Sequence, residues 1–331
     1  MEYNNLGRTG AKVSPLCLGC MNFGDGADEG QSVAIMHRAL DAGINFWDTA
    51  DVYAGRGKSE TIVGAALKGR REQVFLATKV HGKMGDGPND QGNSRLHIIK
   101  GCEDSLRRLG VDHIDLYQIH RPQKDVPVDE TLRALDDLIR AGKVRYIGTS
   151  TFAAYQLVES LWASEKLGLN RFVCEQPPYN LLDRRIEREL LPVCQSYGFG
   201  VIPWSPLGGG MLTGKYRRDE QAPADARYSE GKFRGGQPVS EATWKVVEGL
   251  RVLCEDKGVA MDAFALAWVG AQKGVTSPII GPRTLEQLED NLKALEVEIT
   301  PEDEKRVDEL IAPGTAVAEY YSADWSAPVY R

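Results

Sequence analysis

The chain has 331 residues, of which 42% are hydrophobic and 26% are charged, an ordinary composition for a globular protein with a substantial core. Its formal charge of −7 at pH 7 argues against a nucleic-acid-binding protein, because such proteins usually carry a basic excess. No stretch approaches the roughly 18 apolar residues of a membrane span, so we expect no membrane partner.

Short apolar runs rich in β-branched residues alternate along the chain with segments of helical periodicity. The runs predict strands at Leu16–Gly19, Ile44–Asp48, Val74–Lys79, Ile114–His120, Val144–Thr149, Phe172–Gln176, Val201–Trp204 and Ser277–Ile280. Helices are predicted near residues 30–42, 59–68, 94–109, 129–141, 153–167, 186–197, 240–257 and 284–294. Eight strands alternating with eight helices indicate an α/β protein with a (β/α)8 (TIM) barrel. An open doubly wound sheet is the alternative, but the Gly-rich turn that usually follows its first strand is missing.

Three additions to the barrel are predicted. Residues 1–13 form a short hairpin, Gly208–Val239 forms a long loop after the seventh strand, and a further helix follows the barrel near residues 301–311. Barrels of this kind routinely run to this length as one domain, so residues 1–331 are interpreted as a single domain.

Two short motifs are interpreted as structural. Gly57-Lys58-Ser59 resembles the end of a phosphate-binding P-loop, but Val52 stands where that motif requires a glycine. Cys17 and Cys20 have CxxC spacing without the second pair that a zinc site needs, so they are interpreted as buried thiols. The first residues lack the basic and apolar regions of a secretory signal, so we expect reduced cysteines and a cytoplasmic protein.

Polar side chains end several of the predicted strands, where a barrel places its catalytic groups. Asp48 ends the second strand and Tyr53 follows in its loop, Lys79 ends the third, and His120 ends the fourth. A purely structural interpretation is an Asp48–Lys79 ion pair, but it leaves Tyr53 and His120 at the same mouth unexplained. A lysine lowers the pKa of a nearby phenol, and such a phenol can protonate an oxygen that is becoming an alkoxide. The matching step is hydride delivery to a carbonyl carbon, which requires a nicotinamide cofactor.

The chain resembles the aldo-keto reductase family over nearly its whole length. The resemblance is carried, in order, by Phe46–Tyr53, Ala77–Lys79, Tyr117–Pro122, Ile147–Ser150, Glu175–Asn180, Trp204–Gly210 with Leu212–Lys215, and Ile280–Arg283 leading to Asn291. It implies a barrel that can act as a monomer, binds NADP(H) without a Rossmann fold and reduces aldehydes and ketones. We expect a monomer by default and no metal. Tyr53 then matches the proton donor, Asp48 and Lys79 its pKa-setting partners, and His120 the group that orients the carbonyl.

The resemblance also implies the NADP(H) site. Ser150 and Gln176 match the positions that hold the nicotinamide amide, Trp204 the aromatic that stacks on its ring, and Arg283 the cation for the 2′-phosphate. The full set expected to bind the cofactor is Gly19, Met21, Asp48, Ser150, Thr151, Gln176, Trp204, Ser205, Pro206, Leu207, Gly208, Gly210, Lys215, Gly281, Arg283, Thr284, Gln287 and Asn291. Thr151 departs from the family pattern, because many members have Asn there.

The substrate is less well defined by the sequence. Candidate pocket walls include Met21, Phe23, Tyr228, Phe233 and aromatic residues near the C-terminus, while His81 and Arg121 could meet a polar or anionic group. A nicotinamide-binding regulatory or redox-sensing subunit with little catalysis is the alternative function. A metal-dependent isomerase or hydrolase is disfavoured, because among strand-end residues Asp48 and His120 alone are suitable ligands.

Overall fold

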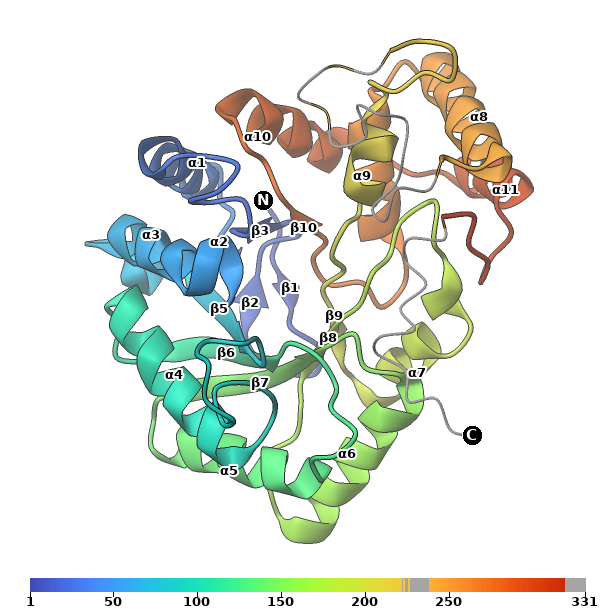
Figure 1. Cartoon of the computed structure of the whole chain (residues 1–331). Helices are drawn as coiled ribbons and strands as arrows, with labels where there is room; N and C mark the ends of the chain where they lie inside the picture. The colour runs from blue at the N-terminus through green and yellow to red at the C-terminus, as the bar shows by residue number, and fades with distance from the viewer. Residues whose placement is uncertain (222, 224–225, 227–237, 319–331) are drawn as a thin grey trace.

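A ring of parallel strands forms the centre of the molecule (Figure 1). The computed structural model describes residues 1–221, 223, 226 and 238–318, and within them the main sheet has eight strands. In hydrogen-bonded order they are β10 (Ile279–Ile280), β3 (Cys17–Gly19), β4 (Phe46–Asp48), β5 (Phe75–Val80), β6 (Ile114–Ile119), β7 (Val144–Ser150), β8 (Cys174–Gln176) and β9 (Gly200–Val201). The ring closes where Val201 bridges Val275 and the Ile279 N–H donates to the Pro203 carbonyl at 2.8 Å. The predicted barrel is therefore confirmed.

Helices surround the strands, and several of them show an apolar face or a side-chain cap in the sequence. They are α1 (Glu29–Asp41), α3 (Lys58–Leu67), α4 (Arg95–Leu109), α5 (Val128–Arg140), α6 (Ala154–Leu167), α7 (Leu190–Tyr197), α9 (Met261–Ala271) and α10 (Leu285–Leu292). In α5, Leu132, Leu135 and Leu138 are buried on one face at helical spacing. In α10, the Thr284 hydroxyl accepts from the Gln287 N–H at 3.1 Å, as its capping motif predicts.

The sequence prediction missed α9, which directly precedes β10 and packs against α10. Its segment is apolar on nearly all sides, so it lacks the polar stripe by which an amphipathic helix is recognised. The predicted helix at 240–257 is α8 (Glu241–Lys257), which packs instead against the additional helix α11 (Pro301–Leu310), as Figure 1 shows at one edge of the molecule. Lys257 and Asp303 join these two helices at 2.8 Å.

The N-terminal hairpin of β1 (Asn4–Asn5) and β2 (Lys12–Val13) covers one end of the barrel. Leu6 and Val13 are fully buried against the inward residues Cys17, Phe46 and Leu116. At Gly7, which has a φ of 56°, an added Cβ would lie 2.5 Å from the Gly200 nitrogen, so the hairpin can approach the barrel closely because this residue has no side chain. The polar carboxyl ends of the strands lie at the opposite end of the barrel, which the hairpin does not cover.

Strand alternation explains why those polar residues meet. Phe46 and Ala77 point into the barrel, while Trp47 and Leu76 point outward to the helices. Residues two positions further along each strand face inward as well, which places Asp48 and Lys79 one layer above the apolar interior. The register puts Lys79 opposite Gln118, and Ser150 opposite Gln176.

Within the described residues, no helix combines the length and hydropathy that a membrane span would need.

Candidate active site

A cleft of about 780 Å³ opens at the carboxyl ends of the strands. Its size is typical of a site for a small molecule or cofactor. Its lining residues come from nearly every strand end and from the loops after β9 and β10. They are Gly19, Met21, Asn22, Asp48, Tyr53, His120, Arg121, Ser150, Gln176, Trp204, Ser205, Pro206, Leu207, Gly209, Gly210, Thr213, Lys215, Asp262, Ile279, Ile280, Gly281, Pro282, Arg283, Gln287, Asp290 and Asn291.

The four side chains expected to carry the chemistry lie together. The Lys79 ammonium donates to the Asp48 carboxylate at 2.5 Å and contacts the Tyr53 hydroxyl at 3.3 Å. The rings of Tyr53 and His120 meet edge to face with centroids 5.6 Å apart. Asp48 and Lys79 are almost completely buried; Asp48 and Tyr53 line the cleft, whereas Lys79 does not. The sequence prediction that these groups converge agrees with the geometry.

Gln118 completes the polar layer and was missed by the sequence analysis. Its Nε2 donates to Asp48 Oδ1 at 2.9 Å, and the Nε2 of Gln176 donates to the same oxygen at 3.1 Å. Gln176 Nε2 also lies 3.1 Å from Gln118 Oε1. A signal was available, because Gln118 is a polar residue inside an apolar strand and stands two positions before His120. The network fixes the carboxylate and orients the Gln176 amide at the cleft wall.

The charge states follow from burial and neighbouring charges. Burial opposes a charged Lys79, but the Asp48 carboxylate raises the pKa of Lys79 to about 12. Burial raises the pKa of Tyr53 above its ordinary value, and the Lys79 ammonium opposes that rise without cancelling it. Burial, helped by Lys79 and Arg121, lowers the pKa of His120 well below its usual range. At neutral pH the site therefore holds a protonated phenol, a neutral imidazole and a charged ammonium.

The segment after β9 is shaped by backbone angles that favour glycine. Gly208, Gly209 and Gly210 have φ values of 56°, 65° and 107° within a short 3-10 segment, Gly208–Thr213. Ser205 also has a positive φ, 54°, and its carbonyl accepts from Asn180 Nδ2 at 3.1 Å. Successive glycines let backbone amides approach a bound anion closely, and Lys215 adds a positive charge to the same wall.

The far end of the cleft is built around the start of α10. The Arg283 N–H donates to Gln287 Oε1 at 2.8 Å, so the side chain of Gln287 is tied to the helix cap. Arg283 and Asn291 line the cleft here. Asp262 and Asp290, which the sequence analysis did not select, also line it. Both cationic and amide groups are thus present where the family resemblance expects a nucleotide.

Three residues expected to bind the cofactor lie outside the cleft lining. Gly208 is a buried residue of the loop after β9, and Thr284 caps α10. Thr151 is buried and has a φ of 60°, which is strained for a β-branched residue by about 1–3 kcal/mol. Its hydroxyl accepts from Arg121 Nη1 at 3.1 Å. The other fifteen residues of that set line the cleft.

Only some of the residues expected to contact the substrate line the cleft. Phe23 is fully buried in the core and cannot contact a substrate. His81 is not part of the cleft lining, and its Nδ1 pairs with Asn93 Oδ1 at 2.8 Å. Tyr228, Phe233 and the C-terminal aromatic residues lie outside the described residues. Met21 and Arg121 line the cleft, as Tyr53 does.

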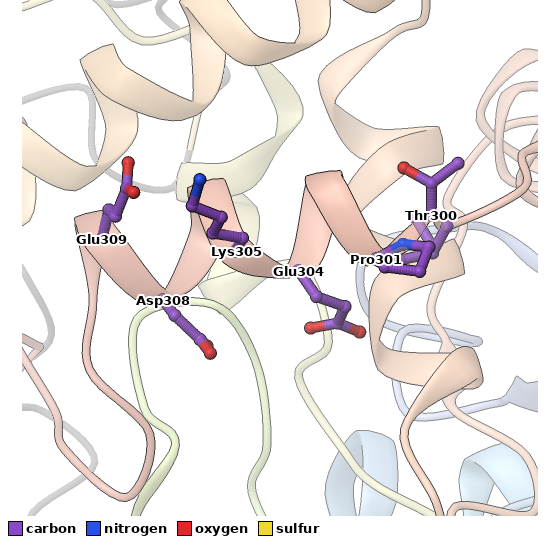
Figure 2. A pocket seen from close by; sticks show the side chains of 7 residues that line it. Thr300, Pro301, Glu304, Lys305, Asp308 and Glu309 are labelled. Atoms are coloured by element: carbon purple, nitrogen blue, oxygen red, sulfur yellow. The ribbon is translucent and has the colours of Figure 1, made fainter.

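A second depression on the surface follows α11 and is not a comparable site (Figure 2). Figure 2 shows that Lys305 and Glu309 project to one side of the helix, and Glu304 and Asp308 to the other. Glu304 is held by Trp268 Nε1 at 3.0 Å, and Asp308 lies 2.7 Å from Arg184. These side chains attach α11 to the barrel and do not converge on a ligand position.

Comparisons with known proteins match this architecture. The sequence model described as "Aldo/keto reductase family" matches residues 15–312. The chain is 42% identical to an uncharacterized oxidoreductase, YrpG, of Bacillus subtilis, over 97% of this chain and all of that protein. It is 38% identical to a probable voltage-gated potassium channel subunit beta of Oryza sativa, again over 97% of this chain and all of the relative. A putative aryl-alcohol dehydrogenase of Schizosaccharomyces pombe is 36% identical, over 94% of this chain and 96% of that protein.

Proposed function

The chain belongs to the aldo/keto reductase family, and from this premise we propose that it reduces aldehydes and ketones to alcohols with NADPH. The family supports an oxidoreductase activity on carbonyl groups. The observation that carries the more specific proposal is the contact of Lys79 with both Asp48 and the Tyr53 hydroxyl, two residues that line the cleft.

Tyr53 is the proton donor in this proposal. Burial keeps its phenol protonated at neutral pH, so the acid is present before the reaction begins. As the proton leaves, the phenolate forms 3.3 Å from the Lys79 ammonium, which stabilises it in a site of low dielectric constant. Asp48 keeps that ammonium charged and fixed in position. The Asp48–Lys79 pair thus stabilises the transition state, in which the phenolate forms, more than it stabilises the resting state.

His120 orients the carbonyl. Its imidazole is neutral, because burial and the charges of Lys79 and Arg121 disfavour a second proton. A neutral imidazole has one N–H to donate, and its ring lies edge to face with Tyr53. A carbonyl oxygen between the two rings would accept from both groups and be aligned for protonation.

The residues present fit NADP(H). When bound, the reduced nicotinamide supplies the hydride to the carbonyl carbon. Ser150 and Gln176 would hold the amide of its nicotinamide group, and Trp204 would cover one face of that ring. Gly210 and Lys215 would contact the pyrophosphate, where the three left-handed glycines already expose the backbone. At the other end, Arg283 would contact the 2′-phosphate, and Gln287 and Asn291 would contact the adenine.

A second candidate function is a nicotinamide-binding regulatory or redox-sensing subunit with little catalysis. It is favoured by the 38% identity to a probable channel subunit of rice. Asp48, Tyr53, Lys79 and His120 lie in contact as the proposed proton transfer requires, which supports the reductase as the main proposal. The two functions differ in turnover, not in cofactor binding.

The test compares the wild type with Tyr53→Phe, using NADPH oxidation with a neutral aldehyde and NADPH titration by tryptophan fluorescence. We expect the variant to lose about 100- to 10,000-fold in kcat while its NADPH affinity stays near wild type. Tyr197→Phe, at an exposed position on α7, is the matched control and should keep full activity. Equal turnover in Tyr53→Phe would refute the proton-donor role. NADPH binding without turnover of any carbonyl would favour the regulatory subunit.

A further inference from the structure

Arg121 is a cation that lines the cleft together with Tyr53 and His120, and the mechanism above does not use it as a substrate ligand. It follows His120 at the end of β6, and its half-buried side chain lines the cleft together with Tyr53 and Ser150. Its charge reaches the reacting groups, because it lowers the pKa of His120 and opposes the rise in the pKa of Tyr53. A substrate whose carbonyl oxygen meets these two groups therefore lies within the field of the guanidinium.

Hydrogen bonds to three neighbouring residues hold the guanidinium in place. Its Nη1 donates to the His120 carbonyl at 2.6 Å, to Thr151 Oγ1 at 3.1 Å and to Ser150 Oγ at 3.4 Å. Thr151 reaches it from a left-handed backbone conformation that a β-branched residue rarely adopts. Strain of this kind persists where the surrounding structure imposes it and often accompanies function. Here its result is a hydroxyl that fixes Arg121 at the cleft wall.

The other charged groups near this end of the cleft, among the residues that the structure describes, are engaged elsewhere. Asp48 is neutralised by Lys79, and its other oxygen accepts from Gln118. Glu175 acts on Arg121 through its field, but its oxygens accept from the Thr149 hydroxyl and the Phe152 N–H. His81, the other candidate from the sequence, is paired with Asn93, and burial lowers its pKa. Lys215 and Arg283 belong to the part of the cleft assigned above to the cofactor.

We propose that Arg121, positioned by Thr151, selects carbonyl substrates that carry an oxyanionic substituent, a carboxylate or a phosphate, near the carbonyl group. A guanidinium is planar and always charged at physiological pH, and it pairs with such groups through two parallel hydrogen bonds. In a partly buried cleft that pairing is screened less than at the surface. This inference rests on the proposed reductase function, and it assigns the substrate class of that same site.

The experiment measures kcat/KM with NADPH for two matched pairs of substrates. Succinate semialdehyde against its methyl ester tests the carboxylate, and glycolaldehyde phosphate against glycolaldehyde tests the phosphate. The wild type should prefer the anionic member of at least one pair, and the pair with the larger preference identifies the oxyanion. Arg121→Met should reduce that preference by about 10- to 100-fold, mainly through KM, as expected for loss of a charge-assisted hydrogen bond.

Further variants separate geometry from charge. Arg121→Lys keeps the positive charge but cannot make two parallel hydrogen bonds, so it should retain part of the preference. Thr151→Val removes the hydroxyl but keeps a β-branched side chain, so it should lower the preference several-fold. Arg283→Met is the control: it should raise the KM for NADPH and leave the ratio between the paired substrates unchanged. A ratio that is unchanged in Arg121→Met for both pairs would overturn the inference while leaving the reductase function intact.

A binding measurement covers the case in which no carbonyl is turned over. Calorimetric titration of the NADPH-loaded protein with succinamate, a carboxylate that the enzyme cannot reduce, should give binding that weakens at least 10-fold in Arg121→Met. Such binding without turnover would refute the reductase function and preserve the anion site. Failure of the wild type to bind succinamate, together with no preference for either anionic substrate, would refute the role of Arg121.

Discussion

The buried ion pair between Asp48 and Lys79 offers the most decisive test of how this site is held together. Asp48 is 3% exposed and Lys79 is fully buried, and their charged atoms are 2.5 Å apart. In Asp48→Asn the amide cannot neutralise the ammonium, which is left with the Thr49 carbonyl at 2.9 Å and the Tyr53 hydroxyl. Leaving one partner of such a pair uncompensated costs about 3–5 kcal/mol. We therefore expect Asp48→Asn to lower the free energy of unfolding by about that amount.

The double variant Asp48→Asn/Lys79→Met separates stability from catalysis. It removes both charges, so the free energy of unfolding should recover most of the loss seen in Asp48→Asn. Its carbonyl reduction should remain abolished, because no ammonium is left to stabilise the Tyr53 phenolate. Urea unfolding followed by circular dichroism measures stability, and NADPH oxidation measures activity.

An exposed pair gives the baseline for this comparison. Arg38 and Glu289 lie 2.7 Å apart with both side chains more than 40% exposed. Glu289→Gln should change the free energy of unfolding by less than about 1 kcal/mol. If Asp48→Asn costs no more than this, or if the double variant is no more stable than Asp48→Asn, the assignment of a tightly coupled buried pair is wrong.

Two further predictions concern a buried acid and a close helix contact. Burial raises the pKa of Glu175 to about 7, so the folded state binds its proton more tightly than the unfolded state, and stability should fall as pH rises from about 4.5 to 7. The loss in the wild type should be at most about 3 kcal/mol, and Glu175→Gln should not show it when the free energy of unfolding is measured across that pH range. The same pH slope in the variant and the wild type would contradict the raised pKa. At Gly64 in α3, an added Cβ would lie 2.5 Å from the Leu109 carbonyl oxygen, so Gly64→Ala should lower the unfolding free energy by about 1–3 kcal/mol. The control Gly30→Ala meets only Asp28 Oδ1 at 3.5 Å and should be neutral or stabilising, and equal losses in both would refute the steric argument.

The strand ends were predictable because a barrel converts sequence position into spatial position. Every parallel strand ends at the same mouth, so Asp48, Lys79 and His120 had to share it once the alternation of strands and helices was recognised. Tyr53 follows in the loop after Asp48, and the left-handed residue Ala54 turns the chain directly after it. Local pattern and family resemblance together were sufficient for this part of the site.

Other features required the coordinates. The helix α9 has no amphipathic period, because it is surrounded by α10, the loop after β9 and the segment Lys293–Glu296. The partners of Gln118 depend on the register of three strands, which no local pattern specifies. Asp262 and Asp290 enter the cleft from two different helices, and their sequence neighbourhoods resemble those of surface acids.

The sequence by itself determined the barrel, its closing hairpin and the chemical types at its mouth, because hydrophobic periodicity and strand-end polarity are local properties. The tertiary structure decided which of those groups touch and how they are charged. Thr151 illustrates the difference: its departure from Asn is visible in the sequence, whereas its left-handed backbone and its contact with Arg121 are not. Contacts and pKa shifts depend on desolvation and on distances between residues far apart in the chain, and folding alone sets both.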